Sequence, residues 1–150
     1  MTIDFEFRRM PKFQAIMVSW KGPWSEKRIQ REFEGVEKWA KARKIRTGRW
    51  IFLEPGDRKW QVGLEVRGAA KGSGRIHLRS FPAARVAQAV FDPEIVSSRV
   101  IYHGITDWLR WRKKDKEIRA VGMYREVYDG NPWRDKKAWA KTTIQVVVKP

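Results

Sequence analysis

The segment Phe7-Arg8-Arg9-Met10-Pro11 returns in the second half of the chain, in related form, as Leu78-Arg79-Ser80-Phe81-Pro82. Each copy is followed by an apolar run, at 13–20 and at 85–91. These runs are rich in β-branched and aromatic residues, which predicts two mostly buried strands. The recurrence indicates that the chain is built from two copies of one structural unit.

An amphipathic helix is predicted after each of these strands. In the first half Ser25 can cap a helix that ends around Lys44, and its apolar face carries Ile29, Phe33, Val36 and Ala40. In the second half Ser97 or Ser98 can cap the equivalent helix. Its apolar face is expected to carry Ile101, Ile105, Trp108, and Trp111 or Arg112.

Two further strands are expected after each helix, at 49–54 and 59–66 in the first half and at 121–128 and 139–148 in the second. The turns Glu54-Pro55-Gly56-Asp57 and Asp129-Gly130-Asn131-Pro132 join the members of each pair. Each half therefore reads as a β-α-β-β unit.

The two units span about 3–67 and about 76–149, with a flexible, small-residue linker at about 68–75. A unit of this size cannot bury a one-faced sheet well alone. We therefore expect a single α+β domain over residues 1–150, in which tandem pseudo-symmetric repeats form one antiparallel sheet with two main helices and a central cleft.

The charge of the chain is strongly positive. Lys and Arg number 33 against 17 Asp and Glu, which gives a net charge of +16. Such a field attracts nucleic acid, anionic surfaces and acidic ligands alike. The segment from Arg110 to Arg119, with Trp108 and Trp111, and the pair Lys136-Lys137 are candidate nucleic-acid contacts, or else a solvated helix end.

Several classes of protein are excluded or disfavoured by the sequence. The chain has no cysteine, no long apolar run and no secretory signal, so we expect a cytoplasmic protein that does not insert into a membrane. His77 and His103 are the only histidines and have no ligand spacing around them, so no metal is expected. Phosphate-binding and dinucleotide-binding loops and the nucleophile elbow are missing, so no cofactor is expected either.

Aromatic residues are the more unusual feature. Nine Trp in 150 residues exceed what a core of this size needs, and they indicate an aromatic cavity or contact surface. Tyr124, Glu126 and Tyr128 share one face of a predicted strand. A carboxylate among rings needs a partner or a task, unless Glu126 turns to solvent or pairs with Arg125 or Arg119 on the surface.

A family resemblance rests on these same segments. The sequence combines Gly22-Pro23-Trp24, a helix with Trp39 near its end, and Glu126-Val127-Tyr128 followed by Pro132. In this it resembles the GyrI-like, or gyrase-inhibitor-like, small-molecule-binding family, which is similar to the effector-binding domain of multidrug-sensing transcription activators. The resemblance covers about residues 3–149.

The resemblance implies tandem β-α-β-β repeats around an aromatic pocket that holds one acidic residue. Family members bind lipophilic, often cationic compounds; some regulate transcription, some antagonise gyrase, and some hydrolyse cyclopropane-bearing natural products. The family's Glu-x-Tyr motif falls on Glu126 and Tyr128, and its Gly-x-aromatic loop on Gly22 and Trp24. The second copy of that loop, Asp92-Pro93-Glu94, departs from the pattern because it has no glycine.

The sequence thus predicts a stand-alone protein that binds lipophilic, aromatic or cationic small molecules. The expected ligand-binding residues are Trp20, Trp24, Trp50, Phe52, Phe91, Tyr124, Glu126 and Tyr128. Two alternatives stay open: a hydrolase in which Glu126 and Tyr128 are catalytic, and a basic module that binds DNA or a topoisomerase. Core packing is expected for Trp39, Trp60, Trp108 and Trp139, and Trp133 could form a surface lid.

Overall fold

The computed structural model describes residues 3–54, 58–111 and 119–149. The predicted turn at 54–57 and the basic segment at 110–119 lie mostly outside these described residues. The first half forms β1 (Phe5–Met10), β2 (Phe13–Lys21), α1 (Glu26–Ala42), β3 (Thr47–Glu54) and β4 (Lys59–Val66). The second half forms β5 (His77–Phe81), β6 (Ala84–Phe91), α2 (Ser98–Trp111), β7 (Arg119–Tyr128), α3 (Lys136–Ala140) and β8 (Thr142–Lys149).

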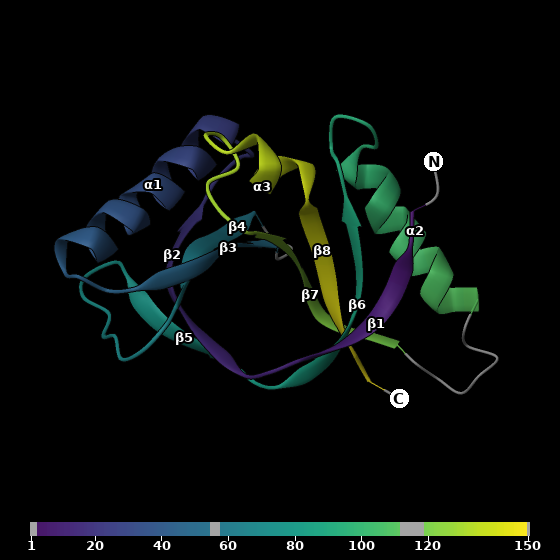
Figure 1. The fold of residues 1–150 in the computed structure, drawn as a ribbon, viewed down its shortest axis with the longest axis horizontal. Helices are drawn as coiled ribbons and strands as arrows, with labels where there is room; N and C mark the ends of the chain where they lie inside the picture. The colour runs from purple at the N-terminus through teal and green to yellow at the C-terminus, as the bar shows by residue number, and fades with distance from the viewer. Residues whose placement is uncertain (1–2, 55–57, 112–118, 150) are drawn as a thin grey trace.

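The strands form one antiparallel sheet in the order β1-β6-β8-β7-β3-β4-β2-β5. This confirms the predicted α+β class. The strands β1 to β4 of the first half correspond to β5 to β8 of the second. Replacing each strand by its counterpart gives the same order read from the other end, so a pseudo-two-fold axis passes between β3 and β7. The sheet is strongly curved, with α1 and α2 at opposite sides and α3 between them (Figure 1).

The two halves exchange their first strands, which sequence reasoning did not anticipate. β1 of the first half pairs with β6 of the second, and β5 of the second pairs with β2 of the first. Only Pro11-Lys12 and Pro82-Ala83 connect each exchanged strand to the next one along the chain. The unit is therefore β-β-α-β-β rather than β-α-β-β, and each half completes the sheet of the other.

Helix α1 forms as its sequence predicts. The Ser25 hydroxyl accepts a hydrogen bond of 3.2 Å from the backbone N–H of Arg28, and this cap satisfies one of the free donors of the first turn. The buried face consists of the four expected residues, Ile29, Phe33, Val36 and Ala40.

Helix α2 differs from expectation on its buried face. Ser97 accepts from the N–H of Val100 at 3.4 Å, and the buried residues are Ile101, Ile105 and Leu109. Trp108 lies at the side and packs on Phe7 with ring centroids 4.7 Å apart, while Trp111 is 76% exposed. The apolar face therefore follows a spacing of four residues, which places Leu109 instead of a tryptophan against the sheet.

The strand predicted at 139–148 begins later, at Thr142. The preceding residues form the short helix α3, because the Asp135 carboxylate accepts a hydrogen bond of 2.9 Å from the N–H of Lys137 and caps it. This helix carries Trp139 and follows the loop that contains Trp133.

Both faces of the central sheet are buried. One apolar cluster lies under α1, a second lies under α2, and a third, containing Met17, Ile51 and Phe81, lies on the opposite face. Four consecutive residues of β2, 15–18, are buried for this reason. No helix in the described part of the chain is long and apolar enough to cross a bilayer.

Candidate ligand-binding pocket

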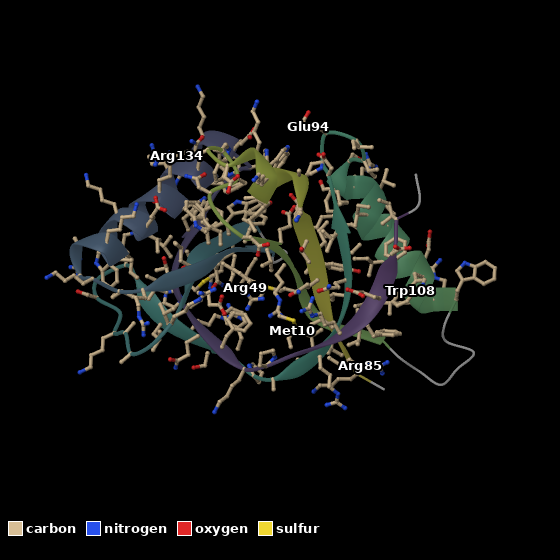
Figure 2. The ribbon with its side chains drawn as sticks, in the orientation of Figure 1. Met10, Arg49, Arg85, Glu94, Trp108 and Arg134 are labelled. Atoms are coloured by element: carbon tan, nitrogen blue, oxygen red, sulfur yellow. The ribbon has the colours of Figure 1, made fainter. Side chains whose placement is uncertain are left out.

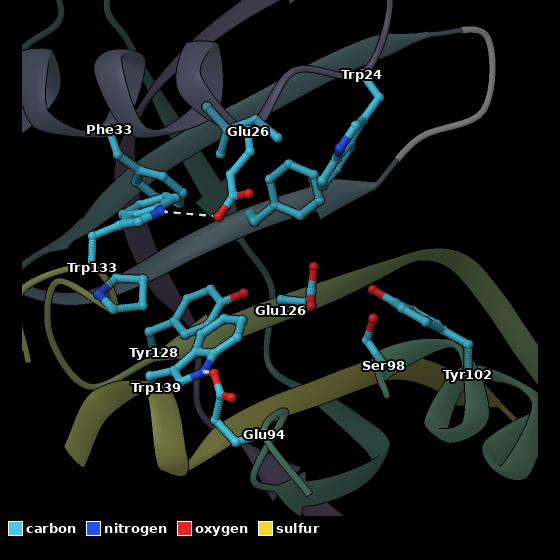
Figure 3. A pocket seen from close by; sticks show the side chains of 13 residues that line it. Trp24, Glu26, Phe33, Glu94, Ser98, Tyr102, Glu126, Tyr128, Trp133 and Trp139 are labelled. Atoms are coloured by element: carbon cyan, nitrogen blue, oxygen red, sulfur yellow. Dashed lines mark hydrogen bonds between the residues drawn. The ribbon is translucent and has the colours of Figure 1, made fainter. Parts of the chain in front are cut away.

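A cavity of about 510 Å³ lies between the two halves on the helix-covered face. This volume is typical of sites that enclose small organic molecules. The first half lines it with Trp24, Glu26, Ile29, Phe33 and Phe52. The second half lines it with Glu94, Ser98, Tyr102, Glu126, Tyr128, Pro132, Trp133 and Trp139 (Figure 3).

The rim of the pocket is formed by Trp24 in the loop before α1. Gly22 in that loop has a φ of +153°, and its carbonyl accepts a hydrogen bond of 3.0 Å from the indole N–H of Trp60. Trp24 stands edge-on to Phe52 and Trp60, with ring centroids 6.2 and 5.7 Å away. It is 61% exposed, so much of its ring is open to solvent at the edge of the cavity.

The floor of the pocket holds Glu126. It projects from β7 between Tyr128 and Tyr102, whose hydroxyl groups point toward its carboxylate from two sides (Figure 3). Tyr128 is 7% exposed and stacks on Trp139 with an interplanar angle of 11°. Arg125, the residue before Glu126, points to the other face of the sheet because successive strand residues alternate. There it donates a hydrogen bond to Gln145.

Two further carboxylates line the same cavity, and each accepts a hydrogen bond from an indole. Trp133 Nε1 donates to Glu26 at 3.4 Å, and Trp139 Nε1 donates to Glu94 at 3.0 Å. These bonds fix where the carboxylates lie on the walls. Among the described lining residues there are three Glu and no Lys, Arg or His. The pocket is therefore acidic within a protein of net charge +16.

Four of the eight residues predicted from the sequence line this cavity: Trp24, Phe52, Glu126 and Tyr128. The structure places the other four elsewhere. Trp20 and Trp50 belong to the core under α1, and Phe91 to the core under α2. Tyr124 lies edge-on to Tyr102, and its hydroxyl is 3.0 Å from the Thr106 hydroxyl.

Trp50 illustrates why a residue on the predicted face can still lie outside the pocket. It shares the helix-covered face with Phe52, but Phe33 of α1 lies over it with ring centroids 5.0 Å apart, and Trp50 is only 3% exposed. Strand alternation gives the face of a side chain, whereas its access depends on which helix residue covers it.

Glu26, Glu94 and Trp139 were not predicted from the sequence to line the pocket, and Trp133 was predicted only as a possible surface lid. Glu94 carried a signal, since it stands in the loop that replaces the glycine loop of the first half. Trp139 was expected in the core; it packs on Tyr128 and also lines the cavity. In the described residues no group of three His, Asp or Glu side chains is arranged to hold a metal ion.

The fold and the cavity define a small-molecule-binding domain. The chain belongs to the GyrI-like family, because the model of the GyrI-like small molecule binding domain matches residues 3–149. No curated protein matches the chain in sequence.

Solved structures with the same fold include the C-terminal domain of EcmrR, at 18% identity and a TM-score of 0.77, with 99% of each chain covered. A hydrolase encoded by lin2189 from Listeria innocua is 15% identical with a TM-score of 0.62, and the match covers 97% of this chain and 91% of that one. SAV2435 bound to tetraphenylphosphonium is 10% identical with a TM-score of 0.54, covering 97% and 94%. These similarities show a shared fold.

Proposed function

We propose that this protein binds lipophilic, aromatic cations in the pocket between its halves, with Glu126 as the central anion. The observation that carries the proposal is the distribution of charge: the described residues that line the cavity include three carboxylates and no basic side chain, although the whole protein is strongly positive. A site that merely followed the composition of the chain would be basic.

The walls suit a cation whose charge is spread over rings. Such a cation is weakly hydrated, so it loses little on entering an apolar cavity, and a carboxylate attracts it more strongly there than in water. Trp24, Phe52 and Tyr128 offer ring faces or edges, and each cation–π contact contributes roughly 0.5 to 2 kcal/mol. SAV2435, which has the same fold, is bound to tetraphenylphosphonium, a compound of this class.

Two ions of equal size and opposite charge test the proposal. We expect tetraphenylphosphonium to quench the Trp fluorescence saturably, and tetraphenylborate to leave the pocket empty although the net charge of the protein favours anions. Saturable binding of the borate in competition with the phosphonium would show that the cavity selects shape alone, and it would overturn the role of charge.

The variant Glu126→Gln locates the effect. It keeps the size of the side chain and removes the charge, and we expect the phosphonium affinity to fall about tenfold or more. Glu37→Gln removes one carboxylate from α1 outside the pocket lining and is the matched control. Equal losses of phosphonium affinity in both variants would show that only the net charge of the protein matters.

Hydrolysis of a reactive lipophilic compound is the second candidate. The observation that favours it is the position of Glu126 between two tyrosyl hydroxyls, where a proton could pass between a carboxyl group and a bound substrate (Figure 3). A neighbour of the same fold is described as a hydrolase. Turnover of a cyclopropane-bearing compound that is abolished in Glu126→Gln and reduced in Tyr128→Phe would establish catalysis; binding without turnover would leave the protein a receptor.

A further inference from the structure

A buried cation lies on the face of the sheet that no helix covers. Arg125 is 6% exposed, and its side chain leaves β7 on the opposite face of the sheet from its neighbour Glu126. Phe13 and Phe81, stacked at 4.6 Å, lie 5.3 and 5.8 Å from its guanidinium. Within the described parts of the chain Arg125 forms no ion pair, and burial together with the nearby Arg49 lowers its pKa to about 10.

The acceptor that Arg125 does have belongs to a directed chain of side chains. Arg125 Nε donates to Gln145 at 2.8 Å, Gln145 donates to Gln88 at 2.8 Å, and Gln88 donates to Glu6 at 2.7 Å. These residues are successive Cα partners across β7, β8, β6 and β1. The carboxylate that ends this chain, Glu6, is thus two glutamines away from the guanidinium.

The carboxylate of Glu65, beside Arg49, is already paired with that arginine. Glu65 accepts hydrogen bonds from Arg49 Nε at 3.0 Å and from Arg49 Nη2 at 2.9 Å. This two-bond ion pair occupies Glu65 and leaves Nη1 of Arg49 outside it. Arg49 and Arg125 together therefore hold two positive charges next to one negative charge.

A second cavity, of about 370 Å³, opens at this cluster. Its charged lining residues are Arg8, Arg49 and Lys141 against Asp129, and Thr143 and Gln145 add polar groups. Arg49 points into the curve of the sheet near Met10, another lining residue (Figure 2). Arg125 reaches the same wall through its hydrogen bond to Gln145.

We infer that this cavity is a second ligand site, which binds the carboxylate or phosphate group of a small anion. A guanidinium that is buried without an ion-pair partner costs free energy, and an anion at the adjacent wall reduces that cost. Three basic side chains around one opening, with planar guanidinium donors among them, match the geometry of an oxyanion. The inference is independent of the cation pocket, which lies on the opposite face.

The test uses the side-chain Nε–Hε signals of Arg125 and Arg49 in NMR spectra of the whole protein. Titration with inorganic phosphate, and separately with acetate, at constant ionic strength should shift the signals saturably. The stronger of the two anions identifies the group that the site prefers. Saturation by phosphate alone or by acetate alone would each support the site and would define its ligand.

Matched variants separate this site from general screening of the +16 charge. Arg8→Gln and Lys141→Gln, both at exposed lining residues, should each weaken binding roughly fivefold, and Asp129→Asn should strengthen it. Arg9→Gln and Lys149→Gln remove equal charge from exposed residues outside the lining and should leave binding unchanged. Glu126→Gln should also have no effect.

Three results would overturn the inference. Shifts that rise linearly without saturation would show screening alone. Equal losses in the control variants would show that net charge and not the cavity attracts the anion. Unshifted signals with both anions would show that Gln145 and the two phenyl rings suffice to hold Arg125.

Discussion

Phe52 and Glu126 are Cα partners in the antiparallel ladder of β3 and β7. This ladder is the one at which the two halves of the protein meet, so a ring from one half and a carboxylate from the other share the floor of the pocket. Because both are carried by central strands and not by loops, the carboxylate and its apolar neighbour are held in fixed positions relative to each other.

The ring of Phe52 should matter for binding beyond its volume. Phe52→Leu keeps a buried apolar side chain but loses the flat surface that stacks near Trp60 at 6.1 Å and meets the edge of Trp24. We expect an affinity for tetraphenylphosphonium about fivefold lower and a free energy of unfolding lower by about 1 kcal/mol.

Phe81→Leu is the control for that variant, because Phe81 is buried on the other face of the sheet. It should cost a similar free energy of unfolding, measured in urea, and leave the phosphonium titration unchanged. Equal affinities in the two variants would mean that Phe52 acts only through stability.

The indole N–H of Trp139 should help the pocket to select cations. Trp139→Phe keeps a ring against Tyr128 but removes the donor that holds Glu94 at 3.0 Å. With its carboxylate no longer oriented toward the cavity, the protein should bind tetraphenylphosphonium about threefold more weakly. Neutral triphenylphosphine oxide should bind as before, and an equal loss for both ligands would assign Trp139 to shape alone.

The stability of the fold should depend on pH through Glu65. Hydrogen bonds from the Arg49 side chain, aided by its backbone N–H and its charge, lower the pKa of the Glu65 carboxyl despite partial burial. A carboxyl group with a pKa lower in the folded than in the unfolded state adds stability above its unfolded pKa. That contribution is lost as the pH falls through the folded pKa.

Urea unfolding between pH 7 and pH 3 measures this contribution. The free energy of unfolding should decrease toward low pH in the wild type, and less steeply in Glu65→Gln. Arg49→Gln should flatten the dependence in the same way, because it removes the cation that lowers the pKa of Glu65. A wild-type slope in Arg49→Gln would show that another group is responsible.

The sequence was sufficient to predict the two main helices, α1 and α2, but not α3 or the exchange of strands. Ser25 and the apolar face of α1 are local signals, read within a few turns of one segment. The pairing of β1 with β6 depends on residues far apart in the chain, and Glu6, Arg8 and Arg9 give β1 a polar, exposed pattern. No local feature of such a strand predicts which strand it will pair with.

The site was half predictable for a similar reason. Period-two alternation placed Glu126 and Tyr128 together, and the structure keeps both at the pocket. Glu26 was missed because an acidic residue in the first turn of a helix already has an explanation in the helix dipole. That it also faces Trp133 of the second half depends on the packing of the two repeats, which no local pattern contains.

Gln145 should be among the most sensitive positions for stability. It is 3% exposed, accepts from Arg125 and donates to Gln88. Gln145→Leu keeps a similar volume but removes the acceptor of a buried cation and leaves the Gln88 carbonyl without its donor. We expect a loss of about 3 kcal/mol in the free energy of unfolding. Gln14→Leu, which removes an exposed hydrogen bond to Ser80, should cost almost nothing.

A second substitution separates the charge of Arg125 from the packing of Gln145. In Gln145→Leu the guanidinium stays buried without its acceptor, so replacing it as well, by Arg125→Met, removes the group that carries the cost. The double variant should therefore recover most of the lost stability, because deleting both partners of a buried polar pair costs less than deleting one. A double variant as unstable in urea as Gln145→Leu would place the cost in the packing of β8 and not in the buried charge.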